Sequence, residues 1–157
     1  MSIFMNYEGI NGEVTASGHE QWIDLDSVNW GATRGITAAT GTNQNREATS
    51  VSINEFTVTK LIDDASPYLL RESCIGTGKE VKIALTKTGD KLEKYLEYTL
   101  RDVMISGYHV NTDGERPVET ITMSFTKLEQ SYTPFDDANK AQASVKNSYD
   151  LSTAKMG

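Results

Sequence analysis

The stretch that decides the fold is residues 58–70, VTKLIDDASPYLL, where a strand pattern ends and a helix pattern begins. Up to Asp63 the chain alternates in the period-two manner of a half-buried strand. Ser66 then offers a side-chain oxygen to the free amides of a first helical turn, and we expect it to be the N-cap. Pro67 follows at N1, where its missing N–H costs nothing. The stretch therefore predicts a strand that leads directly into a helix.

The helix itself is expected to be short. Residues 68–75 supply about two turns at 3.6 residues per turn, and Leu69 and Leu70 are its expected packing positions. Either Gly76 or Gly78 is expected to close it in a left-handed cap, the conformation that glycine adopts without steric cost. One short helix is thus set into a chain that otherwise reads as strands.

The rest of the chain predicts a mainly β fold in one domain, residues 1–157. Short segments rich in β-branched and aromatic residues alternate with turn residues, which is typical of a sandwich or barrel. The clearest alternation places Ile121, Met123 and Phe125 on one face and hydroxyl residues on the other. The expected strands are residues 3–7, 22–30, 51–59, 80–86, 95–110, 118–128 and 148–153.

Composition excludes several classes of protein. The chain of 157 residues carries a formal net charge of −7, and an acidic domain repels phosphate backbones, so nucleic acid is not an expected partner. No window reaches the ~20 apolar residues of a membrane span, so membrane insertion is not expected. Residues 1–8 lack the basic and apolar regions of a secretory signal. We therefore expect a cytoplasmic protein that, if it leaves the cell, does so by a route that reads the folded chain.

Residues suited to catalysis are few. His19 and His109 lie in a turn-like region and at a strand end, and both are interpreted as surface histidines. Cys74 is the only cysteine, so no intrachain disulfide can form, and we expect it to be a small packed residue. Asp63 and Asp64 precede the helix and favour its dipole. We accordingly expect no enzyme activity, and no catalytic, cofactor-binding or metal-binding residues.

A long polar segment interrupts the strand pattern. Residues 38–50 are rich in Thr and Asn and show no periodicity. A long loop between strands is uncommon in a compact domain and is often functional, although a hairpin tip without a function is an equal alternative.

Five segments, in this order along the chain, match the motifs of one known family, and each match is weak alone: Gly9–Glu13, Ile23–Leu25 with Asn29–Gly31, Val58–Leu69, Tyr98–Val103, and Glu119–Phe125 with Tyr132–Pro134. Together, over the whole chain, they resemble the Hcp (hemolysin-coregulated) tube proteins of bacterial type VI secretion. The chain departs from the family pattern in two places: residues 38–50 lack a glycine run, and Asn147-Ser148 replaces a common glycine.

The resemblance implies a two-sheet β-barrel of the Hcp and phage tail-tube type with one flanking helix. It implies a homo-hexameric ring, stacking of rings into a tube, and small secreted effectors carried in the lumen. The implied partners are a tail-spike protein at the tube tip and a contractile sheath, and the implied localisation is cytoplasmic and then secreted without a signal peptide by the type VI system. By position in the family motif, Asn29 is the candidate lumen-facing residue. The candidate ring-stacking residues are Thr40, Gly41, Thr42, Asn43, Gln44, Asn45, Arg46 and Glu47.

Two other functions remain open from the residues alone. A monomeric β-sandwich that binds sugars or peptides would use an exposed Trp22 or Trp30, because aromatic faces stack on sugar rings. A small hydrolase is disfavoured by the lack of converging titratable groups. A phage tail-tube protein shares the expected architecture and is the nearest neighbouring interpretation.

Overall fold

The computed structural model describes residues 1–38, 46–48, 50–87 and 93–157. Its elements in chain order are β1 (Ser2–Tyr7), β2 (Ile23–Leu25), β3 (Ser27–Asn29), β4 (Ala32–Thr33), β5 (Ile36–Ala38), β6 (Arg46–Ala48), β7 (Ser52–Ile53), β8 (Phe56–Leu61), α1 (Ser66–Ile75), β9 (Lys79–Lys87), β10 (Glu93–Asn111), β11 (Val118–Ser124), β12 (Lys127–Tyr132), β13 (Val145–Asp150) and β14 (Lys155–Met156). The mainly β class with one short helix is confirmed.

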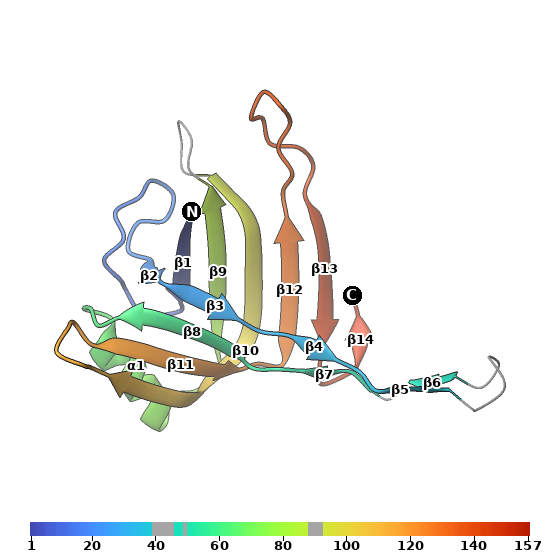
Figure 1. The fold of residues 1–157 in the computed structure, drawn as a ribbon, viewed down its shortest axis with the longest axis horizontal. Coiled ribbons are helices and arrows are strands. Elements are labelled where there is room, and N and C mark those ends of the chain that lie inside the picture. The colour runs from blue at the N-terminus through green and yellow to red at the C-terminus, as the bar shows by residue number, and fades with distance from the viewer. Residues whose placement is uncertain (39–45, 49, 88–92) are drawn as a thin grey trace.

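The long strand β10 joins two sheets that meet at an angle (Figure 1). Its first part pairs with β9 on one side and with β12 on the other, and β9 and β1 extend this sheet to β2. Its second part, from Met104 onward, pairs with β11, which continues to β8 and then β3. We call the first group sheet A and the second group sheet B. The strand path ends at β14 and at β3 without closing on itself, so the described strands do not form the closed barrel that was expected.

One hydrophobic core fills the space between the two sheets. Sheet B contributes Phe56, Val58, Ile121 and Met123, all fully buried, at the inward positions of β8 and β11. Inward residues of the other sheet, together with Trp30, pack against them. The period-two alternation of the sequence thus predicts the inward faces of these strands.

Two predicted strands are each split by the structure. The segment 22–30 forms β2 in sheet A and β3 in sheet B, and the chain changes sheet at Asp26, whose amide donates to Thr59 O at 2.8 Å. The segment 118–128 ends its first strand at Ser124, and residues 127–132 form β12 in the other sheet. In both cases the chain turns the corner of the sandwich, and the apolar positions change phase there, from Ile23 and Leu25 to Val28 and Trp30 and from Met123 and Phe125 to Leu128.

The helix α1 lies behind sheet B in Figure 1. Leu69 is fully buried, whereas Leu70 is 49% exposed, so only the first of the two expected packing residues packs on the body. The helix ends at Gly76 with φ −65° and ψ 152°, an extended conformation, so the expected left-handed cap is wrong. Cys74, expected to be packed, is exposed.

A narrow arm leaves the body near Trp30. It begins with the pair β4 and β7 and continues with the pair β5 and β6 (Figure 1). Each pair is a sheet of two strands. The candidate stacking residues 40–45 lie outside the described residues, and Arg46 and Glu47 belong to β6.

Candidate functional site: a buried ion cluster and a hydroxyl face

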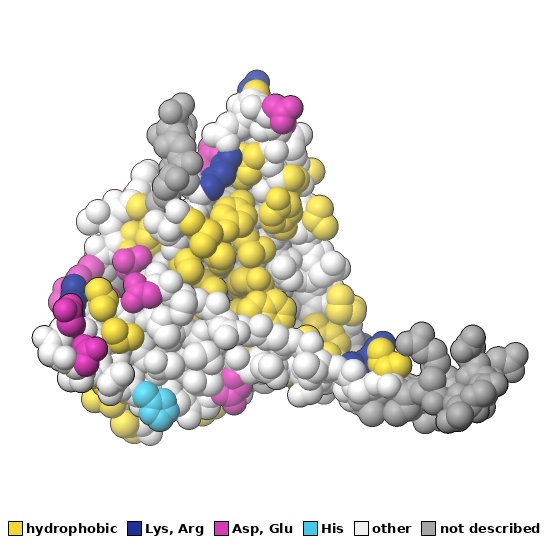
Figure 2. All heavy atoms as spheres, in the orientation of Figure 1, with side chains coloured by type: hydrophobic (Ala, Val, Ile, Leu, Met, Phe, Trp, Pro, Cys, Tyr) yellow, Lys and Arg dark blue, Asp and Glu magenta, His cyan; other side chains and the backbone are white. Residues whose placement is uncertain are grey.

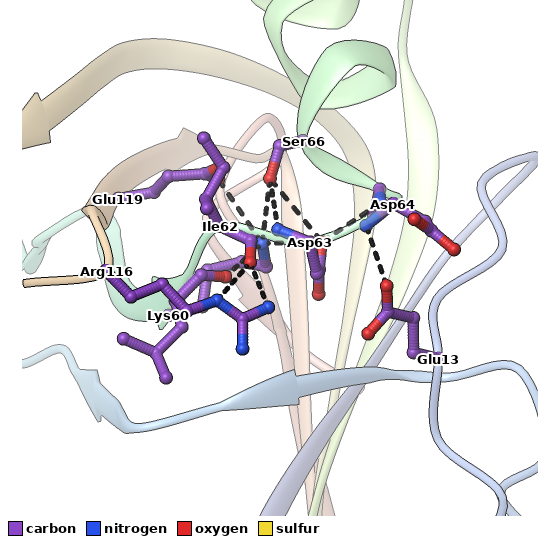
Figure 3. A network of polar contacts seen from close by, with 10 residues as sticks. Glu13, Lys60, Ile62, Asp63, Asp64, Ser66, Arg116 and Glu119 are labelled. Carbon is purple, nitrogen blue, oxygen red and sulfur yellow. Dashed lines mark hydrogen bonds and ion pairs between the residues drawn. The ribbon is translucent and has the colours of Figure 1, made fainter.

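A buried lysine lies at the junction between β8 and α1 (Figure 3). Lys60 Nζ donates to Asp63 Oδ1 at 2.8 Å and to Leu61 O at 2.9 Å. It also reaches Ser66 Oγ at 3.3 Å and Glu119 Oε2 at 3.4 Å. The side chains of Lys60 and Glu119 are both 0% exposed. A buried ammonium is tolerated only when it is paired and hydrogen-bonded, and this cluster meets that condition.

The same cluster organises the turn into the helix. Ser66 Oγ accepts a hydrogen bond from the Asp63 amide at 2.9 Å, and Asp63 Oδ1 accepts one from the Ala65 amide at 2.9 Å. The N-cap residue is Ala65 and makes no side-chain capping bond, while Ser66 is the first helical residue. The expectation that Ser66 caps the helix is therefore wrong: its hydroxyl folds back onto the turn, because the lysine and the Asp63 amide lie there.

Two residues from other parts of the chain hold the turn from outside. Arg116 Nε donates to Ile62 O at 2.9 Å, and Glu13 Oε1 accepts from the Asp64 amide at 3.1 Å. Figure 3 shows both side chains flanking the turn. Segments far apart in sequence thus converge on residues 62–64, which explains why this short stretch determines the position of the helix.

The cluster contains one cation and two carboxylates. Burial, and then the adjacent Glu119 carboxylate, raises the pKa of Tyr108 to about 12. The phenol therefore stays neutral beside the cluster at physiological pH. Because Lys60, Glu119 and Ser66 are buried, the cluster does not meet a substrate in this structure, and its chemistry is that of a clamp between helix and sheet.

The outer face of sheet B carries a different kind of surface. Asn29 lies opposite Thr57, and Ser27 lies opposite Thr59, with their hydroxyl oxygens 2.5 Å apart. The same two threonines lie opposite Thr122 and Thr120 of β11, and Thr120 lies opposite His109 of β10. Directly paired residues of adjacent strands share a face. We call this surface the hydroxyl face: Ser27, Asn29, Thr57, Thr59, His109, Thr120 and Thr122.

The hydroxyl face is polar, and one carboxylate, that of the exposed Glu55, lies at its margin, where it accepts a hydrogen bond from Ser106 Oγ of β10. Its seven defining residues include no Lys, Arg, Asp or Glu, and they are exposed or half-buried. In Figure 2 the region over β3, β8 and β11 is mostly white, below a broad apolar patch. Sequence alternation predicts the hydroxyl-rich side of β11, and the structure extends that side across three further strands, including the position of Asn29.

Sequence reasoning missed the buried cluster and one histidine. Lys60 and Glu119 occupy inward positions of their strands, and a charged residue at an inward position of an alternating strand is a signal that can reveal such a pair. His19, interpreted as a surface residue, is only 7% exposed and lies between Phe4 and Trp22, with ring centroids at 5.3 and 4.7 Å. His109 is exposed, as expected.

In the part of the chain that the structure describes, no group of three or more His, Cys, Asp or Glu side chains is arranged to hold a metal ion. Within those same residues, no helix has the length and apolar character needed to cross a membrane.

Comparisons with known proteins place the chain in a family. Residues 4–132 match the family model described as "Type VI secretion system effector, Hcp". A structure titled "Structure of a type six secretion system protein" is similar, with a TM-score of 0.90, 25% identity and 99% of each chain covered. A type VI secretion system effector from Yersinia pestis has a TM-score of 0.75 and 26% identity, with 94% of this chain and 98% of that chain covered. This chain belongs to the Hcp family of type VI secretion proteins.

One further comparison supports the shared fold only, and another found no match. Hcp1 from Salmonella typhimurium has a TM-score of 0.80 at 22% identity, with 99% of this chain and 98% of that chain covered, and supports the shared fold. A search of the curated proteins found no match to this chain.

Proposed function

We propose that this chain is a structural subunit of the type VI secretion inner tube. Copies assemble into hexameric rings, the rings stack into a tube, and small effectors travel in the lumen. The proposal includes a tail-spike protein at the tube tip, a contractile sheath around the tube, and release from the cytoplasm by the type VI system. Family membership and the likeness to other Hcp structures support this assignment.

The observation that carries the proposal is the hydroxyl face. A channel wall must be wetted by water and must not bind its cargo tightly. Hydroxyl and amide groups hydrogen-bond to water, and a surface without fixed charge does not retain cargo of either sign through long-range attraction. Asn29, the candidate lumen residue, lies on this face together with Thr57, its cross-strand partner. We therefore assign this face to the lumen.

The monomeric binding module has less support. Trp30 is half-buried, with its ring stacked at 5.2 Å on Phe56 and edge-on to Tyr98, and Trp22 packs against His19. Both tryptophans thus contact aromatic side chains of the same chain and are only partly exposed. The function as a tube subunit is thus the one that we carry forward.

Light scattering coupled to size-exclusion chromatography tests the assembly. A ring elutes at about six chain masses, because heterologous contacts close into rings when the rotation allows it. A strictly monomeric mass at tens of micromolar would contradict the proposal.

The lumen assignment has its own test. Asn29→Arg adds one positive charge per subunit to the hydroxyl face and should change the recovery of co-expressed small effectors while leaving the ring mass unchanged. Asn6→Arg is the matched control, because Asn6 is exposed on β1 of sheet A. Equal effector recovery with both variants and the parent would remove Asn29 from the lumen.

The stacking residues are tested by deletion. We expect a chain shortened between Thr42 and Arg46 to form rings but neither tubes nor secreted protein. If the shortened chain still stacks and is secreted, residues 40–47 have no role in stacking.

A further inference from the structure

The arm lies at one end of the molecule's longest axis and has little support from the body (Figure 1). Its outer part, β5 and β6, is a sheet of only two strands. Two-stranded hairpins are marginally stable in water unless another surface covers them. Ile36, at the start of β5, is 51% exposed. The arm thus has the properties of a segment that is stabilised by contact with a second molecule.

The arm is positively charged at its base. Arg34 is exposed between β4 and β5 and forms no ion pair with any described residue. Residues 31–53 contain two arginines and one glutamate, in a chain whose net charge is −7. The arm therefore carries charge opposite to that of the molecule as a whole.

The other end of the long axis has a pocket of about 400 Å³ with an acidic lining. Glu13, Asp24, Asp26 and Asp63 contribute carboxylates, and Arg116 is the one basic residue in the lining. Figure 2 shows acidic side chains gathered at this end. Asp63 is paired with Lys60, which leaves an excess of negative charge on the remaining three carboxylates.

Two further features suit an arginine side chain. Burial, and then the neighbouring Asp26 and Asp63, raises the pKa of Asp24, so an added cation would relieve a crowded set of carboxylates. The pocket wall also includes apolar groups of Phe4, Val14 and Ala16, against which the aliphatic stem of an arginine can pack.

We propose that the base of the arm of a second copy, led by Arg34, docks on this acidic pocket. The two surfaces lie at opposite ends of the long axis, so one copy placed behind another along that axis brings them together. Such a contact is heterologous, and repetition of it builds a filament instead of a closed pair. This inference rests on the proposed function and identifies the surface that receives the arm when one ring stacks on the next.

A single copy of the proposed contact is weak, and stacking depends on several identical contacts. A guanidinium can donate two hydrogen bonds to one carboxylate, but a partly exposed ion pair of this kind is weak and is screened by salt. Identical contacts around one ring boundary act together, which multiplies their effect. Stacking should therefore fall steeply as ionic strength rises, while the ring itself persists.

Charge reversal tests the contact. Arg34→Glu and Asp24→Arg should each lower the fraction of protein that sediments as tubes at least tenfold, with the ring mass unchanged. The double variant, Arg34→Glu with Asp24→Arg, should restore sedimentation because the pair is re-formed with its signs exchanged. Lys140→Glu is the control: it makes the same charge change as Arg34→Glu at an exposed position in the segment that precedes β13, and it should stack like the parent.

The outcomes separate this inference from the proposed function. Rings that stack equally well in the parent and both single variants overturn the docking surface and leave the tube subunit intact. A double variant that stays unstacked also overturns the pairing. If Asp24→Arg does not fold, Asp26→Arg replaces it with the same expectations. A parent protein that never forms rings overturns both the function and the contact.

Discussion

Lys60 and Glu119 face each other across β8 and β11, with Nζ 3.4 Å from Oε2 and neither side chain exposed to solvent. The two residues lie directly opposite each other in the register of these strands. Asp63 and Ser66 extend the network of polar contacts to the helix. The position of α1 on the sheet thus depends on a buried ion pair. The contribution of that pair to the free energy of unfolding can be measured.

Lys60→Met should be strongly destabilising. It leaves Glu119 buried without its cation, and loss of one partner of a buried pair costs about 3–5 kcal/mol. The double variant Lys60→Met with Glu119→Met should recover part of this loss, because it leaves no unpaired carboxylate buried at position 119. Lys94→Met, which breaks the exposed pair with Glu97, should cost less than about 1 kcal/mol. Urea unfolding measures all three, and equal losses for Lys60→Met and Lys94→Met would show that the buried pair contributes little.

Ser66→Ala tests the role of the hydroxyl in the turn. The substitution leaves the Asp63 amide without its acceptor and removes one contact of Lys60, and an unsatisfied buried donor costs about 1–3 kcal/mol. Ser73→Ala on the same helix removes an exposed hydroxyl that donates to Leu70 O at 2.6 Å. That change should remain within about 0.5 kcal/mol. A thermal shift of similar size for both variants would place Ser66 outside the network.

Leu69 and Leu70 are adjacent residues with opposite environments, fully buried and 49% exposed. Leu69→Ala should lower the free energy of unfolding by about 2–5 kcal/mol through lost burial and a residual cavity. Leu70→Ala should change it by less than about 1 kcal/mol, since alanine is also a good helix former. Denaturant midpoints separate the two. A larger loss at Leu70 would mean that the helix packs on the sheet through another face.

Local sequence patterns were sufficient to predict which residues of the strands face the core. The alternation of β8 and β11 identifies which residues point inward, because successive side chains of a strand point to opposite sides whatever the partner strand is. The hydroxyl side of β11 could be predicted for the same reason. That Asn29 joins this face depends on the register between β3 and β8, and the sequence supplied it only through the family resemblance.

Features that depend on distant contacts were not predictable. Asp26 is the point where the chain leaves sheet A for sheet B, and the apolar positions change phase there, from Ile23 and Leu25 to Val28 and Trp30. That change marks an irregularity, but which sheet receives each half depends on the distant strands β1 and β8. The Ser66 hydroxyl has the sequence position of an N-cap, but Lys60 and the Asp63 amide compete for it. His19 has polar neighbours in sequence and becomes buried only because the segment before β2 folds over Phe4.

The burial of His19 predicts a pH dependence of stability. Burial, and then the nearby Lys94, lowers its pKa below the ordinary value of 6.5, against opposing effects of the Ser17 backbone, Glu97 and Glu20. The unfolded chain therefore binds a proton at higher pH than the folded chain does. Stability from this group is fully present above the unfolded pKa and is lost as pH falls through 6.5 toward the folded value.

The free energy of unfolding should thus decrease on acidification below neutrality, and His19→Gln should reduce that slope. His109→Gln, at an exposed position of the hydroxyl face, is the control and should retain the parental slope. Urea unfolding at a series of pH values measures these slopes, and an unchanged slope in His19→Gln would show that another group carries the pH dependence.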